Sequence, residues 1–371
     1  MAAKNKKSTV KAAKKAIKSA KLNINVVILA AVIIIALIVG VTVFRTEVGE
    51  FIKNISAPCP EPTEDFEVNP SVLGGSTLVS LPVELGEIGL EIHFIDVGQG
   101  DAIVVRFPDG KDMIVDAGST SGGGGVSHLL DYLQLINIDY FDYMLATHHD
   151  ADHIGMLDDV LGAYQVHNIY YNGDSHTTQA FTNFDTAAKA EGAEIYRFDE
   201  DGGIYDTKIV GEDYKVVIYA PGYDRFDGFN ADSPIVSIEY AGRRVLLTGD
   251  AEQLTEQWFI DQIDGDIYDC DVLKVGHHGS ASSSATYFLD FIQAEYAVIS
   301  VGDVNSYAHP DPMVMNKLFD RGMVTYRTNR HGNIVLYIDE DGEFAFGTER
   351  EEITENNRFG INDRQIIAGE G

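Results

Sequence analysis

A short apolar run at residues 143–146 leads directly into a dense cluster of histidines and aspartates. The run predicts a buried strand, and imidazole nitrogens with carboxylate oxygens at its end suit a divalent ion such as zinc or manganese. Helix capping is the alternative interpretation, but a cap needs one carboxylate and explains none of the histidines. We therefore predict a metal loop that runs into a helix and supplies four ligands: His148, Asp150, Asp152 and His153.

Two further apolar runs also end in side chains that bind metals. Asp250 follows the run at residues 244–248, and His277 and His278 follow the run at residues 271–275. Taken alone, Asp250 also fits a helix cap, and the histidines also fit a structural pair. Alternation along a strand points neighbours in opposite directions, so one histidine is expected to bind metal and the other to face the substrate. The spacing does not show which of the two histidines binds the metal and which faces the substrate.

Our assignment divides these residues into metal ligands and catalytic groups. The predicted metal ligands are His148, Asp150, Asp152, His153, Asp250 and His277. The predicted catalytic groups are Asp152, His278 and His309. A single histidine before a proline is common in loops, so the alternative of a structural residue is strongest for His309.

The charge of the chain is unusual and unevenly distributed. The 371 residues carry a formal net charge of −31, yet residues 1–25 contain eight lysines and no acid. The remainder therefore holds 19 basic against 58 acidic residues, a balance of −39. Such a surface repels nucleic acid and anionic lipid at long range, so a polyanionic substrate would have to be attracted locally by metal ions.

Residues 26–44 contain no charge, and their length is close to the roughly 20 residues that span a bilayer as a helix. The lysines before this run and the glutamates after it predict a cytoplasmic segment at 1–25 and an extracytoplasmic remainder. A cleaved signal peptide is the alternative, but its apolar core is normally shorter. We expect a single-pass protein of the cell membrane with its catalytic domain outside.

The rest of the chain divides into three parts by composition. Residues 45–87 include five prolines and many small or acidic residues, which predicts an extended linker. Residues 88–347 alternate strand-like and helix-like runs, whereas residues 348–371 form a polar tail. Hairpins in both halves, with helices between them, predict an α+β domain of two mixed sheets packed face to face under outer helices.

The motifs and their order resemble the metallo-β-lactamase-fold superfamily, and within it the ComEC-like branch of competence proteins. The matching stretches lie at residues 94–102, 115–118, 148–153, 247–250, 273–280 and 307–310. The resemblance implies a four-layer αββα sandwich with metals at one edge of the two sheets. It also implies that Asp116 is a strand-end carboxylate that supports the metal loop.

Two departures from the superfamily pattern bear on the metals. Asp150 stands where the commonest motif has a second histidine, as is typical of the ComEC-like branch, and the third histidine of the first site is missing before Asp250. In the stretch before Asp250 where that histidine is expected, the sequence has only Asn230 and Asp232 in its place. The resemblance then implies a first site of His148, Asp150 and Asp250. It implies a second site of Asp152, His153, Asp250 and one of the two adjacent histidines.

These features predict a metal-dependent hydrolase that uses one or two divalent ions, zinc or manganese. The resemblance makes a phosphodiester the expected substrate, in nucleic acid or in a cell-wall polymer. Two alternatives remain open: a hydrolase of β-lactams or thioesters, and a non-catalytic surface binding protein that metal stabilises. Full-length competence channels contain many membrane helices, so no transport role follows from the resemblance.

Overall fold

The computed structural model describes residues 85–120, 125–173, 176–198, 202–223 and 225–350. All of them belong to the second of two compact units, Pro70–Gly371. The predicted basic segment at 1–25, the predicted membrane helix at 26–44 and most of the linker and tail lie outside the described residues. Within the described part of the chain, no helix has the length and apolar character needed to cross a bilayer.

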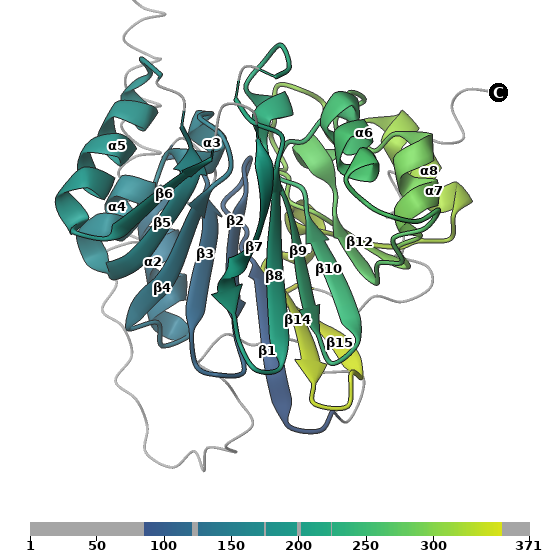
Figure 1. Ribbon diagram of the computed structural model, residues 1–371, viewed down its shortest axis with the longest axis horizontal. Coiled ribbons are helices and arrows are strands. Elements are labelled where there is room, and N and C mark those ends of the chain that lie inside the picture. Colours follow the sequence, from purple (N-terminus) through teal and green to yellow (C-terminus); the bar gives the residue numbers. More distant parts are fainter. Residues whose placement is uncertain (1–84, 121–124, 174–175, 199–201, 224, 351–371) are drawn as a thin grey trace, which may run out of the picture. The chain divides into compact units, whose positions relative to one another are not determined.

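One sheet of eight strands forms one side of the domain (Figure 1). Its central strands β3, β4 and β5 run parallel, and their neighbours β2, β1, β14 and β15 pair antiparallel. In spatial order the strands are β15 (Phe344–Thr348), β14 (Ile334–Asp339), β1 (Ile88–Phe94), β2 (Ala102–Arg106), β3 (Asp112–Ala117), β4 (Tyr140–Ala146), β5 (Gln165–Asn172) and β6 (Glu194–Phe198).

A second sheet of seven strands forms the other side. Strands β10 to β13 run parallel, and β7, β8 and β9 pair antiparallel beside them. In spatial order the strands are β13 (Val324–Arg327), β12 (Tyr296–Ile299), β11 (Val272–Lys274), β10 (Arg243–Leu247), β9 (Ile235–Tyr240), β8 (Tyr214–Ala220) and β7 (Gly203–Val210).

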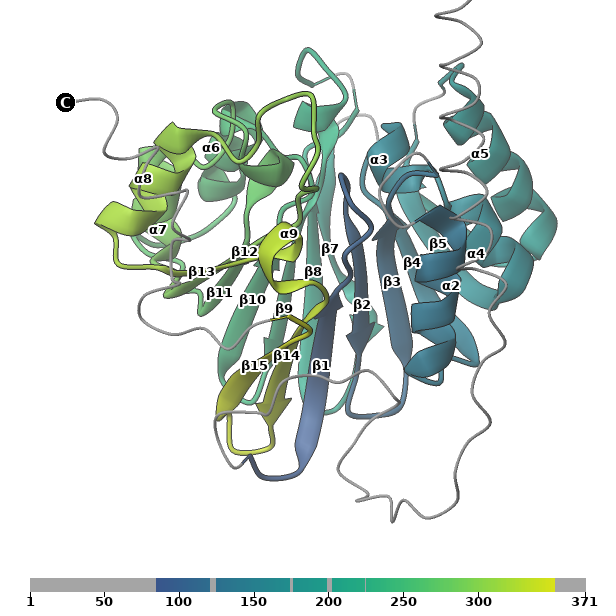
Figure 2. The same ribbon diagram turned by 180° about the vertical axis from the view of Figure 1, so that it is seen from behind.

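Three buried cores hold four layers together. The central core lies between the sheets, and two outer cores join each sheet to its helices. Figure 1 and the reverse view in Figure 2 show the two helical layers on opposite outer faces. The first sheet is covered by α2 (Gly125–Leu135), α4 (Leu157–Ala163) and α5 (Gln179–Glu191), and the second by α6 (Gln253–Asp261), α7 (Thr286–Ile292) and α8 (Pro312–Asp320). The predicted αββα arrangement is confirmed.

Strand β1 shows how the sequence produces this layering. Leu90, Ile92 and Phe94 alternate with polar residues, and all three enter the central core. His93 faces the outer layer instead, where its Nδ1 lies 2.9 Å from the hydroxyl of Tyr132 on α2. The period of two therefore places apolar side chains between the sheets and a hydrogen-bonded pair beneath the helix.

Most predicted elements match the observed ones within a few residues, with two corrections. The sequence pattern did not show β7, an edge strand whose register with β8 is irregular. The helix expected from residue 154 onward is instead two short helices, α3 (Ala151–Ile154) and α4, separated at Gly155. A Cβ at Gly155 would meet the carbonyl oxygen of Ala151 at 2.2 Å and that of Gly118 at 3.0 Å. The chain therefore turns where strand β3 passes close to it.

Candidate metal centre

The predicted metal loop connects the end of β4 to the short helix α3. Asp150 precedes the helix, but its side chain makes no capping hydrogen bond with any described residue. The residue at the start of α6 is Glu252, so Asp250 is not the cap of that helix either. Residues at or just after the ends of β3, β4, β10, β11 and β12 contact one another, through Asp116, His153, Asp250, His278 and Ser300. The capping alternatives therefore do not describe these carboxylates.

Asp250 is the centre of the cluster. Its Oδ1 lies 3.1 Å from Nε2 of His153 and 3.5 Å from Nε2 of His278. Its Oδ2 lies 3.9 Å from Nε2 of His148 and 3.6 Å from Nε2 of His277. The two oxygens of one buried carboxylate thus face two different sets of imidazoles, as a carboxylate that bridges two ions does.

Among the described residues, three groups of donor atoms have the spacing of ligands that share an ion; one consists of Asp101, Asp116 and His153, and the other two lie around Asp250. Of these two, the first contains His148, His153 and Asp250, and the second contains Asp152, His153 and His278. Bonds of about 2.1 Å to a tetrahedral ion separate its ligand atoms by roughly 3.4 Å. Nε2 of His278 lies 3.4 Å from Oδ2 of Asp152 and 3.3 Å from Nε2 of His153.

Three of the imidazoles are fixed by their other ring nitrogen. Nδ1 of His153 donates to Asp116 at 2.7 Å, and Nδ1 of His278 donates to the carbonyl oxygen of Ser300 at 2.9 Å. Nδ1 of His148 lies 3.1 Å from the hydroxyls of Thr147 and Ser233. Histidines that bind metal are oriented in this way, with one nitrogen anchored and the other left as a lone-pair donor.

Asp116 has the supporting role that the resemblance implies. It is the next-to-last residue of β3 and has a φ of 55°, a left-handed conformation that aspartate adopts more readily than most residues. Its carboxylate accepts hydrogen bonds from the backbone N–H of Thr147 at 2.9 Å and from the Thr147 hydroxyl at 2.7 Å. Together with His153, these contacts attach the metal loop to the first sheet.

The carboxylates of the cluster create a strong demand for positive charge. Burial lowers the pKa of His153, but Asp250 and Asp116 outweigh it and hold that pKa well above its usual value. Burial opposes charge on His278 too, yet Asp250 and the hydrogen bonds with Asp101 and Asp152 raise its pKa to about 10. Burial raises the pKa of Asp250, whereas His153 and His278 hold it well below its usual range. A divalent cation supplies the same positive charge.

His148 gives a further sign that the site accommodates an ion. Its Nε2 is buried and has no hydrogen-bond partner among the residues that the structure describes. The nearest carboxylate oxygens, of Asp150 and Asp250, lie 3.7 and 3.9 Å away, too far for hydrogen bonds. A buried polar atom without a partner is costly, and an ion between these three donors would satisfy it. The residues present therefore fit a divalent metal.

The two adjacent histidines do not lie on a strand. They form a tight turn of left-handed backbone, with φ of 48° at His277 and 52° at His278. His278 is buried and points at the second donor group, the place that the sequence assignment gave to His277. The side chain of His277 is 21% exposed, and its Nε2 lies 3.0 Å from the amide nitrogen of Asn230.

The remaining predicted residue, His309, lies beside His277, with ring centroids 5.6 Å apart. The ring of Tyr307 stacks on its other side at 5.6 Å. Burial and the charges of His277 and His278 lower the pKa of His309, which favours its neutral form. His309 is not in either donor group and lies beside His277, whose side chain is partly exposed.

Sequence reasoning missed several residues that complete the centre. Ser233 directly follows Asp232 and the stretch where the superfamily's third histidine is missing, and its hydroxyl contacts His148 and accepts from the backbone N–H of Asp250 at 3.2 Å. Asp101 and Lys274 form a buried ion pair behind His278. The stretches that contain Asp101 and Lys274 were part of the resemblance. Only the contacts across the two sheets show where these side chains lie.

Comparison with known proteins agrees with this geometry. The model of the metallo-beta-lactamase superfamily matches residues 95–303. The chain is 28% identical to ComE operon protein 3 of Bacillus subtilis over 72% of its own length and 36% of the relative. It is 30% identical to Recombination protein 2 of Haemophilus influenzae (68% and 29%) and 26% identical to Competence protein ComA of Neisseria gonorrhoeae (67% and 32%). It thus spans about a third of the relatives that it matches.

Solved structures resemble the chain at lower identity. The diiron β-hydroxylase CmlA from Streptomyces venezuelae is 14% identical, with a TM-score of 0.44 over 69% of this chain and 55% of CmlA. Zn²⁺-bound PqqB from Methylobacterium extorquens is 12% identical, with a TM-score of 0.41 over 64% and 87%. The family match over more than half of the chain and the competence-related relatives together show that the chain belongs to the metallo-beta-lactamase superfamily, in its ComEC-like branch.

Proposed function

We propose that this chain is a metal-dependent phosphodiesterase. The observation that carries the proposal is the position of Asp250, whose two carboxylate oxygens face separate sets of imidazole Nε2 atoms. Ions bound there would supply Lewis acidity and lower the pKa of a coordinated water toward about 7. The side chains that would hold them are His148, Asp150, Asp152, His153, Asp250 and His278.

In this proposal His278 takes the ligand position, and His277 takes the substrate position. A phosphoryl oxygen at the open side of the site would lie near His277, Asn230 and His309, which can donate hydrogen bonds to it. Glu252 supports His277 from behind, with Oε1 3.5 Å from its Nδ1. Donors placed toward developing negative charge favour phosphoryl transfer over binding alone.

Asp152, which the sequence predicted both as a metal ligand and as a catalytic group, serves only as a ligand in this arrangement and not as a proton acceptor. Burial raises the pKa of Asp152, but the hydrogen bond from His278 and the charge of His153 outweigh it and lower that pKa to about 2. A carboxylate of such low pKa is a weak base at neutral pH. It is well suited to binding a cation, because it stays ionised.

The substrate is proposed to be a phosphodiester that reaches the site locally. The excess of acidic residues repels long polyanions, whereas a metal centre attracts a single phosphate group at short range. The names of the relatives, which refer to competence and recombination, support nucleic acid as one source. A cell-wall polymer is the other. We further propose that residues 26–44 anchor the chain in the cell membrane with residues 88–347 outside.

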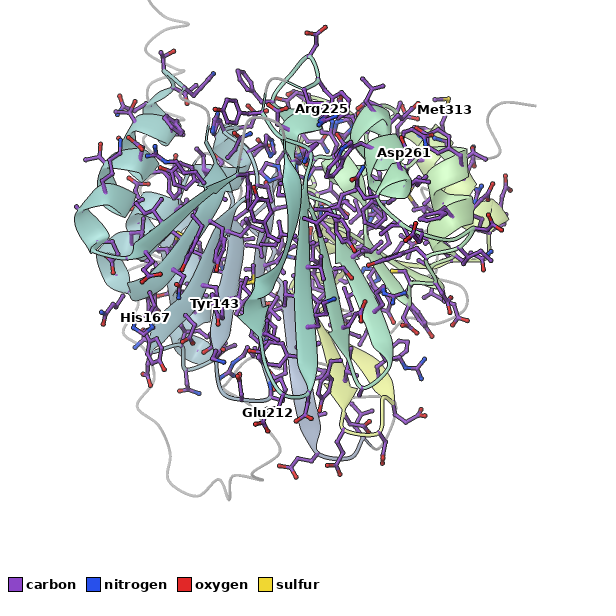
Figure 3. The ribbon with its side chains drawn as sticks, viewed as in Figure 1. Tyr143, His167, Glu212, Arg225, Asp261 and Met313 are labelled. Carbon is purple, nitrogen blue, oxygen red and sulfur yellow. The ribbon has the colours of Figure 1, made fainter. Side chains whose placement is uncertain are left out.

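Hydrolysis of bis-p-nitrophenyl phosphate by the full-length chain, with Mn²⁺ or Zn²⁺, tests the reaction. We expect turnover that Asp250→Asn abolishes and that His167→Ala leaves unchanged. His167 is a suitable control because its side chain is 45% exposed and lies far from α3, near the opposite end of the strands (Figures 1 and 3). Turnover of a chromogenic β-lactam or a thioester instead would favour the alternative hydrolases. Tight metal binding with no turnover of any of these would favour a binding protein.

A further inference from the structure

A fully buried ion pair lies directly behind the metal centre. Nζ of Lys274, the last residue of β11, lies 2.8 Å from Oδ2 of Asp101, in the loop between β1 and β2. Their side chains are 0% and 1% exposed, and no other lysine or arginine ion pair within the described ranges is buried on both sides to this degree. Desolvation makes such a pair a weak source of stability, so stability alone does not account for it.

The pair contacts two members of the second donor group. Oδ1 of Asp101 lies 3.4 Å from Nδ1 of His278, the ring nitrogen that faces away from the centre. The backbone N–H of Asp101 donates to the carbonyl oxygen of Asp152 at 3.1 Å. Asp101 therefore touches His278 from the second sheet and Asp152 from the metal loop at the same time.

The loop that carries Asp101 packs closely against neighbouring segments. A Cβ at Gly100 would meet the carbonyl oxygen of Asp152 at 2.2 Å, and a Cβ at Gly302 would meet the backbone nitrogen of Gln99 at 2.7 Å. On the other side, Nζ of Lys274 also donates to the carbonyl oxygen of Val275 at 3.0 Å. The ion pair thus links a closely packed loop of the first sheet to strand β11 of the second.

We propose that Lys274 and Asp101 are positioning residues that hold His278 and Asp152 at the separation required to share an ion. The inference rests on the proposed metal-dependent function and extends it to a pair that touches neither metal nor substrate. Lys274 fixes the Asp101 carboxylate, and Oδ1 of that carboxylate faces Nδ1 of His278 at 3.4 Å, beside the hydrogen bond from the same nitrogen to Ser300. The backbone N–H of Asp101 holds the metal loop through Asp152. Loss of either charge should disturb the second donor group more than the first.

The test compares three full-length variants with the wild type. Lys274→Met leaves the Asp101 carboxylate buried without its partner, and Asp101→Leu/Lys274→Met replaces both charges by apolar side chains of similar size. Lys111→Met is the control, since Lys111 belongs to a partly exposed pair with Asp109. The measurements are the affinity for Mn²⁺ and Zn²⁺ by competition with a chelating dye, the visible spectrum with Co²⁺, and the thermal midpoint of the metal-free protein.

We expect Lys274→Met to weaken binding of one ion by about 10- to 100-fold and to lower the thermal midpoint, because a supporting residue is lost and a buried charge is unpaired. The double variant should recover the midpoint, since apolar replacement of a buried pair is often neutral or stabilising. Its metal affinity should stay about 10- to 100-fold below wild type, with an altered Co²⁺ spectrum. If the pair were purely structural, the double variant would recover its metal affinity together with its thermal midpoint.

Two outcomes overturn the inference and are distinguishable from each other. Wild-type metal affinity and an unchanged Co²⁺ spectrum in the double variant would reduce the pair to a structural contact and leave the proposed function intact. Failure of the wild type to bind any of these ions would remove the proposed function and the inference with it. If Lys274→Met is insoluble, the double variant still decides.

Discussion

Oδ2 of Asp116 accepts a hydrogen bond from Nδ1 of His153 at 2.7 Å, and both side chains are completely buried. The bond turns Nε2 of His153 toward Asp250, 3.1 Å away. His153 belongs to both donor groups around Asp250, so the orientation of one ring affects the whole centre.

Asp116→Asn is therefore expected to weaken metal binding by about 10- to 100-fold without unfolding the protein. Asparagine tolerates the left-handed backbone at this position and can still accept from Thr147, but it lacks the negative charge that stabilises the His153 imidazole. Competition titration with a chelating dye measures the affinity. Unchanged affinity would show that the bond to His153 does not orient a ligand.

Paired substitutions of the adjacent histidines separate a ligand from a substrate contact. His278→Ala should lose bound metal, because it removes a donor of the second group. His277→Ala should retain the metal while kcat on bis-p-nitrophenyl phosphate falls by about 10²- to 10³-fold, the usual effect of removing one donor to a developing oxyanion. Metal analysis alongside kinetics decides, and the reverse pattern would restore the assignment made from the sequence.

Ser233→Ala should affect the group that contains His148. The hydroxyl of Ser233 contacts Nδ1 of His148 and accepts from the backbone of Asp250, so its loss leaves the His148 ring less fixed. We expect roughly tenfold weaker binding of one ion and a loss of about 1 kcal/mol in the free energy of unfolding. Ser127→Ala, on the exposed surface of α2, is the matched control. Equal affinities for the two variants would contradict this role.

Removal of metal should lower the thermal midpoint of the wild type. An ion that binds the folded chain at about 100 times its Kd adds roughly 2.7 kcal/mol to the free energy of unfolding. A chelator should reverse this gain, and Asp250→Ala should show no response to added metal or chelator, since Asp250 is shared by both sets of imidazoles. A differential scanning measurement with and without chelator reports both effects.

Asp112 is expected to contribute a pH dependence that is independent of the metal. Burial raises the pKa of Asp112 to about 6 from 3.8, with Asp142 and Glu91 adding to the rise and Arg106 opposing it. The folded state thus favours the neutral form, so the contribution to stability is present below pH 3.8 and is lost as the pH rises through about 6. Asp112→Asn should therefore gain stability relative to wild type as the pH rises.

Urea unfolding at several pH values between about 4 and 7 measures this difference. A free-energy difference between wild type and Asp112→Asn that stays constant across the range would contradict the raised pKa. The Asp142 carboxylate accepts a hydrogen bond from the backbone N–H of Asp112 at 3.1 Å. Because the donor is a backbone group, this contact persists in Asp112→Asn.

The sequence by itself determined the order of most strands and helices and singled out the loop that carries several of the candidate metal ligands. Alternation in β1 and the apolar run of β4 follow from burial on one or both faces of a sheet, which local periodicity records. It did not determine β7, because an edge strand is buried on fewer sides and its polar residues break the alternation. Hydrophobic alternation is a weak predictor of a strand that has few buried side chains.

Only the tertiary structure shows that His278, and not His277, belongs to a group of candidate metal ligands. Alternation predicts opposite directions but assumes a strand, whereas both residues adopt left-handed backbone angles between Gly276 and Gly279. A Cβ at Gly276 would meet the carbonyl oxygen of Ala251 at 2.8 Å, and a Cβ at Gly279 would meet Pro310 at 2.6 Å. The conformation of the turn therefore depends on segments that are distant in the sequence. The contact between Lys274 and Asp101 is equally long-range, and a local sequence pattern does not record such contacts.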